Sequence, residues 1–354
     1  MTVAATFTVV TYGDISGWMR DNHAAAFQAF VKSCGRIAKA DATLRTACDA
    51  ASRLDPTGIT SAAARVFFEN QFTPHRVVHA DTAGLLTGYY EPEIDGTRTP
   101  GPHFKVPVYR RPADLVNIVD DSMRGAKSAN LTHGRKTASG VAPYATRAQI
   151  EGGALKGQGL ELVYLADPVD VFFMQVQGSG RISLPDGQKI RVHYDGKNGH
   201  PYTSVGRHLI DTGVLTADKM SLDALGTWLR ADPVRGAKAM QHNASYVFFR
   251  ELIGAEAAGP LGVNGIPLTD GRSLAVDAGV HTIGTPIFVT SPTLTHAAKG
   301  QAFERLMIAQ DVGSAIKGAE RGDIYFGSGD AAGKLAGVTK HPGHFFVLRP
   351  TVKP

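Results

Sequence analysis

The first 75 residues have the periodicity of amphipathic helices. Four apolar side chains follow the i, i+3, i+4, i+7 spacing of one helix face: Phe27, Phe30, Val31 and Cys34. A second apolar stripe, after Ser61, consists of Val66, Phe67 and Phe72. The pattern therefore predicts a helical N-terminal segment.

From residue 76 onward the pattern changes to short β-rich runs separated by Gly, Pro and Asp. The early runs are 76–80, 85–90 and 106–110. The C-terminal runs are 245–249, 273–276, 285–290, 305–309 and 344–348. Repeated short strands of this kind favour a small closed β-barrel.

The middle of the chain mixes strands and helices. It predicts strands at 160–165, 172–177 and 189–194, and helices near 146–155, 205–211 and 222–230. We therefore expect a mainly β protein with α+β character. Its barrel domain, with the helical segment, would comprise residues 1–100 and 240–354, and residues 101–239 would form a smaller inserted α/β domain. Binding sites tend to lie in the groove between two such domains.

Length and composition narrow the class of protein. The chain has 354 residues, of which 43% are hydrophobic and 19% charged, and this ordinary composition excludes wholesale disorder and a coiled coil. The 40 glycines agree with many turns. Basic residues exceed acidic ones by 37 to 32, which favours an anionic partner. Because no run of five or six like charges occurs, a nucleic-acid-binding arm has little support.

The sequence also bears on the compartment. No apolar stretch reaches the roughly 18 residues that cross a bilayer, and residues 1–12 lack the pattern of a signal peptide, so we expect a soluble chain. The two cysteines, Cys34 and Cys48, lie in predicted helices that a loop at 39–41 could fold into a hairpin. A disulfide and two buried thiols fit this spacing equally well. A disulfide would indicate an oxidising compartment.

Several common catalytic motifs are absent from the sequence. The 13 histidines form no His-Glu-x-x-His pair and no cluster with cysteine, and the spacing of His75 and His79 does not suit a metal site in a strand. The Gly-Ser-Gly at 178–180 lacks the Gly-x-Ser-x-Gly frame of a nucleophile elbow. The Gly-Ser-Gly at 327–329 lacks the Lys-Ser/Thr of a phosphate-binding loop. We therefore expect neither a metal nor a cofactor.

Acidic residues in apolar, Gly-rich surroundings are better candidates for catalysis. Asp311 and Asp323 are twelve residues apart, around a loop between two predicted strands. An Asp among Ile, Tyr and Phe is a candidate for a raised pKa, which a general acid needs at neutral pH. The alternative is an Asp that accepts backbone N–H bonds and stabilises a turn. Asp277 has the same ambiguity.

Two other segments suit a polar polymer. If 172–177 is a strand, Gln175, Gln177 and Ser179 face one side and offer amide and hydroxyl groups to a sugar. The Gly-Tyr-Tyr-Glu-Pro at 88–92 adds aromatic faces and an acid at a strand end. The alternatives are an exposed strand face for the glutamines and core positions for Tyr89 and Tyr90.

With these segments the sequence resembles the membrane-bound lytic murein transglycosylase A family. The ordered motifs are Thr-Gly-Tyr-Tyr-Glu-Pro at 87–92 with Pro-Val-Tyr at 107–109, Tyr-Ala-Thr-Arg at 144–147, Phe-Phe-Met-Gln-Val-Gln-Gly-Ser-Gly at 172–180, Asn-Ala-Ser-Tyr-Val-Phe-Phe at 243–249, and the C-terminal block. That block, at about 265–350, resembles the three-aspartate (3D) domain, in which Asp277, Asp311 and Asp323 match the aspartates. Ala244 departs from the family, which commonly has Pro there.

The resemblance implies a double-psi β-barrel, an inserted domain and a glycan groove between them. It also implies cleavage of the β-1,4 bond between N-acetylmuramic acid and N-acetylglucosamine, which leaves a 1,6-anhydromuramyl end. Asp323 matches the catalytic acid, and Asp311 and Asp277 would support it or shape the loop. The candidate contacts to the glycan are Tyr90, Glu91, Gln175, Gln177, Ser179, Gly180, Ser245 and Lys317.

The expected partners are peptidoglycan strands and other cell-wall enzymes, not nucleic acid. The resemblance implies export to the periplasm and, with a lipid anchor, association with the outer membrane. Because no Cys that could carry a lipid lies near Met1, membrane contact is expected only if an anchor has been removed. Two alternative functions are a non-catalytic, expansin-like peptidoglycan-binding module and a hydrolytic glycosidase on the same fold.

Overall fold

The structure, a computed structural model, describes residues 5–37, 42–79, 84–118 and 132–351. The chain divides into two compact units. The first contains residues 1–90, 261–327 and 334–354, and the second contains residues 91–260 and 328–333. The fold is mixed α/β.

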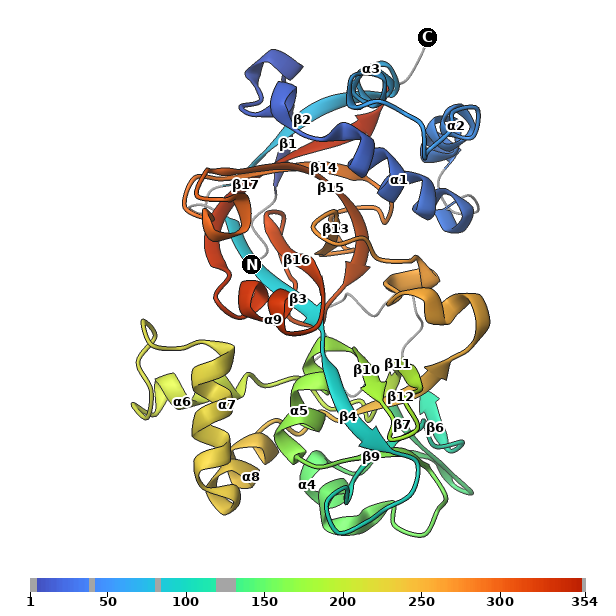
Figure 1. The fold of residues 1–354 in the computed structure, drawn as a ribbon, viewed down its shortest axis with the longest axis vertical. Coiled ribbons are helices and arrows are strands. Elements are labelled where there is room, and N and C mark those ends of the chain that lie inside the picture. The colour runs from blue at the N-terminus through green and yellow to red at the C-terminus, as the bar shows by residue number, and fades with distance from the viewer. Residues whose placement is uncertain (1–4, 38–41, 80–83, 119–131, 352–354) are drawn as a thin grey trace. The chain divides into compact units, whose positions relative to one another are not determined.

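Within the described residues, six strands of the first unit close into a barrel (Figure 1). They are β3 (Gly84–Glu91), β13 (Ser273–Val276), β14 (Pro286–Ser291), β15 (Phe303–Val312), β16 (Arg321–Ser328) and β17 (Lys340–Pro350). The order around the ring is β17-β14-β15-β13-β16-β3, and β3 pairs with β17 again. β13 and β15 run parallel, whereas β13 and β16 are antiparallel. This confirms the closed barrel expected from the short strands.

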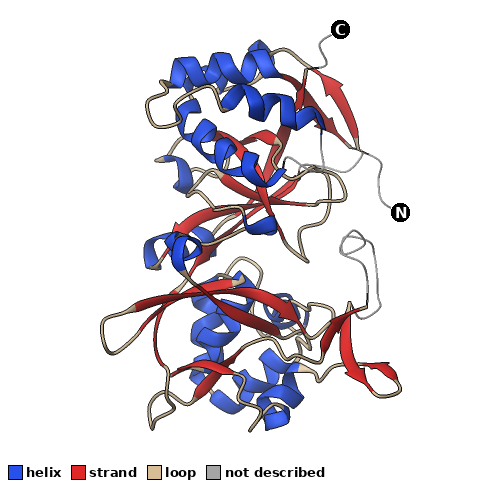
Figure 2. Cartoon of the chain, turned by 90° about the vertical axis from the view of Figure 1, so that its right-hand side faces the viewer, coloured by secondary structure: helices blue, strands red, loops and turns tan. Residues whose placement is uncertain are grey.

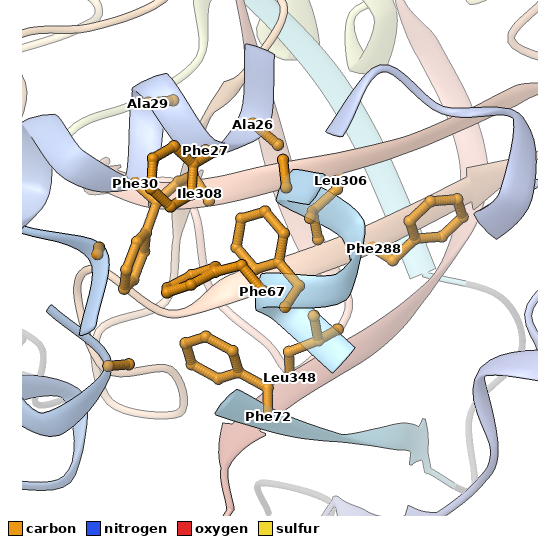
Figure 3. Close-up of a cluster of buried hydrophobic side chains, with 14 of the residues drawn as sticks. Ala26, Phe27, Ala29, Phe30, Phe67, Phe72, Phe288, Leu306, Ile308 and Leu348 are labelled. Carbon is orange, nitrogen blue, oxygen red and sulfur yellow. The ribbon is translucent and has the colours of Figure 1, made fainter. Parts of the chain in front are cut away.

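Helices cover one side of the barrel strands (Figures 1 and 2). They are α1 (His23–Ile37), α2 (Ala42–Ala51) and α3 (Ser61–Gln71), with the short strands β1 (Thr6–Val9) and β2 (Phe72–Val78) beside β17. One hydrophobic core contains Phe27, Phe30 and Phe67 of the helices together with barrel residues such as Phe288 and Leu306 (Figure 3). The Phe67 ring packs edge to face on Phe27 and at a tilt on Phe30. Burial of such aromatic side chains stabilises this layer.

An ion pair links the start of the helical layer to the barrel. The Arg272 guanidinium donates to both oxygens of Asp21 over 2.8 Å, and the backbone N–H of Leu306 donates to Asp21 over the same distance. Burial would raise the pKa of Asp21, but the hydrogen bond and the charge of Arg272 lower it below the ordinary value. Both side chains are buried, so removal of either would leave an unpaired charge.

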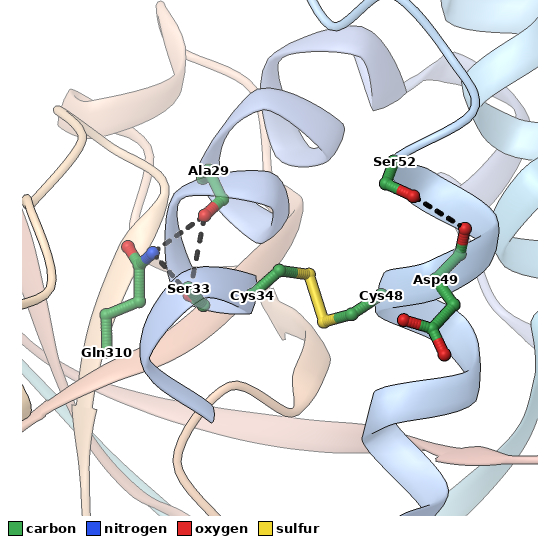
Figure 4. The surroundings of a disulfide bond; sticks show 7 residues. All are labelled: Ala29, Ser33, Cys34, Cys48, Asp49, Ser52 and Gln310. Atoms are coloured by element: carbon green, nitrogen blue, oxygen red, sulfur yellow. Dashed lines mark hydrogen bonds between the residues drawn. A yellow bond between two sulfur atoms is a disulfide. The ribbon is translucent and has the colours of Figure 1, made fainter. Parts of the chain in front are cut away.

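A disulfide joins Cys34 of α1 to Cys48 of α2, with Cα atoms 5.4 Å apart (Figure 4). The expected loop at 39–41 lies outside the described residues. The bond therefore closes a loop between two helices that pack on the barrel.

The second unit contains two sheets and a group of helices. The larger sheet has the order β12-β11-β10-β4-β9-β5, and the smaller has the order β6-β7-β8. Their strands are β4 (Glu93–Thr97), β5 (Val106–Tyr109), β6 (Leu115–Asn117), β7 (His133–Thr137), β8 (Gly140–Ala142), β9 (Glu161–Leu165), β10 (Ser179–Ser183), β11 (Lys189–Lys197) and β12 (Val247–Leu252). The helices are α4 (Arg147–Gln149), α5 (Pro168–Gln177), α6 (Val205–Asp211), α7 (Leu222–Ala231) and α8 (Pro233–Gln241). Helix α9 (Asp330–Gly337) contains a boundary between the units.

The strand predicted at 172–177 is wrong, because these residues belong to α5. The carboxylate of Asp167 accepts a hydrogen bond from the Val169 N–H, Pro168 occupies the first turn, and Gly178 ends the helix with φ of 82°. Asp-Pro before a segment and Gly after it are helix boundary signals that outweigh the apparent alternation. Phe72, expected in a helical stripe, is instead the first residue of β2.

Among the described residues, no helix combines the length and the apolar character needed to span a bilayer.

Removal of the disulfide should destabilise the protein. The Cys34→Ser, Cys48→Ser double variant frees a loop of about 15 residues in the unfolded chain, so we expect the free energy of unfolding to fall by about 3 kcal/mol. Urea denaturation of the oxidised protein, the reduced protein and the variant measures this change. Reduced wild type should match the variant, and equal stability of all three samples would contradict the prediction.

Candidate active site

The strand register places Asp311 and Asp323 on either side of one small residue. Ala275 of β13 pairs with Asp311 of β15 and with Asp323 of β16. Residues paired across neighbouring strands point to the same face of a sheet. Both carboxyl groups therefore extend from the same face, and the methyl group of Ala275 leaves space between them.

A β-bulge in β15 makes this arrangement possible. Leu274 pairs with Ala309 and Ala275 pairs with Asp311, so Gln310 is an extra residue in β15. Without this extra residue Asp311 would move by one position and point to the opposite face. Bulges frequently redirect side chains beside active sites.

The buried side chain of Gln310 holds the bulge against its surroundings. Its Oε1 accepts a hydrogen bond from the Ser273 hydroxyl over 2.5 Å. Its Nε2 donates to the Ala29 carbonyl over 2.7 Å and to the Ser33 hydroxyl over 2.8 Å (Figure 4). The amide is thus satisfied by β13 and α1, and the helical layer helps to set the position of Asp311.

Strand β3 supplies a hydroxyl group to each carboxyl. Thr87 Oγ1 donates to Asp323 over 2.6 Å, and the Tyr89 hydroxyl donates to Asp311 over 2.8 Å. The two residues are two positions apart, so they share one face of the strand. Gly88 faces the other side, where a Cβ atom would lie 2.5 Å from the ring of Phe326. A larger residue at position 88 would therefore push β3 away from this core.

Burial changes the acidity of both aspartates, although each keeps some surface exposed. It raises the pKa of Asp311 to about 6, helped by the charge of Asp323 and opposed by hydrogen bonds from the Val312 N–H and Tyr89. Burial also raises the pKa of Asp323, against the Thr87 hydrogen bond and the positive charge of Arg321. Protonated carboxyl groups near neutral pH can act as general acids.

Asp277 and Lys317 lie in the loop region beside this pair. The Asp277 carboxylate accepts hydrogen bonds from the N–H groups of Gly279 over 3.0 Å and Gly318 over 2.9 Å. The Lys317 ammonium group is 3.4 Å from the same carboxylate. Asp277 thus joins the end of β13 to the segment between β15 and β16, as an aspartate that stabilises a turn would do.

Most of the other expected glycan contacts belong to the second unit, where several are used in packing. Glu91 is fully buried, pairs with Arg191 over 2.5 and 3.0 Å, and accepts the Ser328 hydroxyl over 2.7 Å. Ser245 is buried, and its carbonyl accepts a hydrogen bond from the buried Arg147 over 2.7 Å. These contacts leave the Glu91 side chain little surface for a ligand.

The remaining expected contacts lie on α5, β10 and β3. Gln175 is buried in α5, donates to the Val247 carbonyl, and has no partner for Oε1 among the described residues. Gln177 ends the same helix, and Ser179 and Gly180 begin β10. A Cβ atom at Gly180 would lie 2.4 Å from the Met174 sulfur, so packing explains this glycine. Tyr90 of β3 is half-buried.

Sequence reasoning missed the groups that position the two aspartates. Thr87 and Tyr89 alternate along a correctly predicted strand, and this alternation was the available signal. The roles of Ala275 and Gln310 depend on register, which no local pattern reveals. No cluster of three or more potential metal ligands occurs in the part of the chain that the structure describes.

The fold and the site together define a mixed α/β protein whose closed barrel carries two adjacent, desolvated aspartates, a combination typical of enzymes that use carboxyl groups as acids. Two family profiles match the chain: the MltA specific insert domain at residues 85–250 and the 3D domain at residues 272–349.

Comparisons with whole proteins agree with the two profiles. Membrane-bound lytic murein transglycosylase A of Vibrio cholerae is 36% identical over 269 residues, which are 75% of this chain and 65% of the relative. The chain thus matches slightly less than two thirds of that relative. The chain is also similar to the crystal structure of membrane-bound lytic murein transglycosylase from Agrobacterium tumefaciens, with 36% sequence identity and a TM-score of 0.87. The match covers 98% of each chain.

A second similar structure is that of Escherichia coli MltA with bound chitohexaose. It is 29% identical, with a TM-score of 0.74 and coverage of 98% of this chain and 95% of that chain. The chain belongs to the lytic murein transglycosylase A (MltA) family.

Replacement of Asp311 should stabilise the protein at neutral pH. The pKa of this carboxyl is about 6 in the folded protein, above the ordinary value of roughly 3.9, so its ionisation destabilises the fold as pH rises through this window. Asp311→Asn cannot ionise. We expect its free energy of unfolding to exceed that of wild type by about 2 kcal/mol at pH 8, allowing for residual solvent contact, and to equal it near pH 3.5.

Urea denaturation at both pH values measures the difference. Asp49→Asn, at an aspartate of α2 away from the pair, is the matched control and should show no such pH-dependent gain. A variant that is less stable than wild type at pH 8 would contradict the raised pKa.

Proposed function

We propose that this protein is a peptidoglycan lytic transglycosylase. The reaction would cleave the β-1,4 bond between N-acetylmuramic acid and N-acetylglucosamine and leave a 1,6-anhydromuramyl end. The observation that carries the proposal is the pair of desolvated aspartates in the 3D-domain barrel of an MltA-family chain. Binding of chitohexaose to the E. coli relative supports a glycan substrate.

In the proposed mechanism Asp323 acts first as acid and then as base. Its carboxyl proton moves to the glycosidic oxygen, and the bond from this oxygen to the muramyl anomeric carbon breaks. The muramyl 6-hydroxyl attacks that carbon and returns its proton to Asp323, so that the carboxyl is restored. Because the nucleophile belongs to the substrate, no second catalytic carboxylate is needed, in contrast to ordinary glycosidases. Alignment of an internal nucleophile can lower the barrier by about 7 to 11 kcal/mol in favourable cases.

The residues around Asp323 have supporting roles in this proposal. Thr87 orients the acid through its 2.6 Å hydrogen bond. Asp311, whose pKa of about 6 keeps it partly protonated near neutral pH, limits negative charge beside the acid. Asp277 stabilises the loop between β15 and β16 through its backbone contacts. No step requires a metal or cofactor.

We also propose the finer features that the family resemblance implies. These are a double-psi path for the barrel strands, a substrate-binding role for residues 101–239, and a location in the cell envelope. The disulfide between Cys34 and Cys48 supports an oxidising compartment such as the periplasm. The name of the V. cholerae relative includes "membrane-bound".

Product analysis tests the reaction. Purified sacculi treated with the protein should release soluble muropeptides with 1,6-anhydro ends, which mass spectrometry distinguishes from reducing ends by the loss of one water. Asp323→Asn should lower the rate by at least about a hundredfold, because it removes the general acid.

Asp330→Asn, at an exposed aspartate of α9, is the matched control and should retain full activity. Reducing-end products would identify a hydrolase instead. Binding to sacculi without products would identify a non-catalytic module. Substantial turnover by Asp323→Asn would assign the acid to another residue, with Asp311 as the first candidate.

The Thr87 hydrogen bond should set the alkaline limit of activity. It stabilises ionised Asp323, so Thr87→Val should raise the pKa of the acid further and keep it protonated to higher pH. We expect the alkaline limb of kcat/KM to move up by about one pH unit, with a lower maximum. Thr87→Ser keeps the hydroxyl and should retain the wild-type profile. A downward shift for Thr87→Val would contradict this role.

A further inference from the structure

An open cavity lies among helices α6, α7 and α8 of the second unit. Its volume is about 560 Å³. The residues around it are His208, Leu209, Thr212, Val214, Trp228, Arg235, Lys238, Ala239, Gln241 and His242. None of them belongs to the site of Asp311 and Asp323 or to the family motifs in the sequence.

The described lining of this cavity contains two basic residues and no acidic residue. Arg235 and Lys238 are basic, and neither forms an ion pair with a described residue. The nearby Asp232 carboxylate accepts the N–H groups of Val234 and Arg235 and so caps α8. Glu151 interacts with Arg147 and with the Gln241 amide. The described lining therefore carries positive charge and contains no carboxylate to neutralise it.

Contacts with neighbouring groups hold Arg235 and three rings of the lining in place. The Arg235 guanidinium lies 4.1 Å from the centre of the Trp228 ring and donates to the Trp228 carbonyl over 3.1 Å. The rings of His208 and His242 stack with centroids 3.8 Å apart. A guanidinium that is held on a ring loses less side-chain freedom when it binds a carboxylate.

Apolar groups lie next to these cations. Leu209 and Ala239 are buried, whereas Val214 is 46% exposed. A carboxylate with a small apolar group beside it, such as the end of an alanine-containing peptide, matches this combination of cations and methyl groups.

We infer that the α6–α8 cavity binds the free carboxylates of the short peptides attached to peptidoglycan glycan strands. This inference rests on the proposed function for the identity of the polymer. Arg235 and Lys238 would contact the carboxylates, and Val214 and Trp228 would contact the peptide side chains. The cavity would then favour glycan that carries peptides over bare glycan.

The test compares two forms of the same substrate: sacculi with intact peptides, and glycan strands from which an amidase has removed them. The Arg235→Gln, Lys238→Gln double variant should have a KM about tenfold higher for the peptide-bearing substrate, because it loses two charge-assisted contacts. Its kinetics on stripped glycan should equal those of wild type. Arg207→Gln is the matched control, since this exposed arginine of α6 pairs with Asp211 outside the lining.

Direct binding provides a readout without turnover. Trp228 is one of two tryptophans, and the other, Trp18, is buried in the first unit, so the free peptide should change the emission of Trp228. The double variant should weaken this binding about tenfold, and Lys238→Gln alone, at an exposed position, should weaken it less.

The outcomes separate this inference from the proposed function. If wild type cleaves neither substrate but binds the free peptide through Arg235 and Lys238, the proposed function fails and the cavity assignment stands. Equal losses on both substrates, or no loss on either, would overturn the assignment. Binding of an acidic polypeptide such as poly-glutamate, without binding of the free peptide, would overturn it in favour of an acidic protein partner.

Discussion

The extra residue in strand β15 is the constraint on which the candidate site depends. Gln310 shifts the register so that Asp311 and Asp323 face the same side of β13, with Ala275 between them. A strand without the bulge would keep the barrel but separate the two carboxyl groups. Closure of the barrel is therefore necessary for the site but is not sufficient.

The bulge depends in turn on the helical layer. The amide of Gln310 is buried, and its hydrogen bonds to Ser33 and the Ala29 carbonyl come from α1. The same helix packs its aromatic face on the barrel and is joined to α2 by the disulfide. Helices far from the aspartates along the sequence thus maintain the geometry and the desolvation that raise the pKa values of both aspartates.

The second unit illustrates two different uses of charge. Glu91 and Arg191 are buried and satisfy each other, so that loss of either partner would leave an unpaired charge. Arg235 and Lys238 instead lie at a cavity without a carboxylate in its described lining. The charges of the first pair are satisfied within the fold, whereas the second pair is the one for which we infer a ligand.

The sequence by itself predicted most elements and the barrel strands, and it singled out Asp311, Asp277 and Asp323 as candidates, because periodicity and motifs are local properties. The strand predicted at 172–177 was wrong, because a few alternating residues have the pattern of a strand. The Asp-Pro before this segment and the Gly after it are signals of helix boundaries, and the segment is a helix. The sequence also could not show whether Glu91 is buried and paired or exposed and able to bind a ligand. The burial of Glu91 depends on residues such as Arg191, which is 100 positions away. Only the tertiary structure decided that Gln310 bulges, that Thr87 and Tyr89 reach the two acids, and that the α6–α8 cavity is basic. Register and desolvation arise from contacts between distant segments, and no local pattern encodes them.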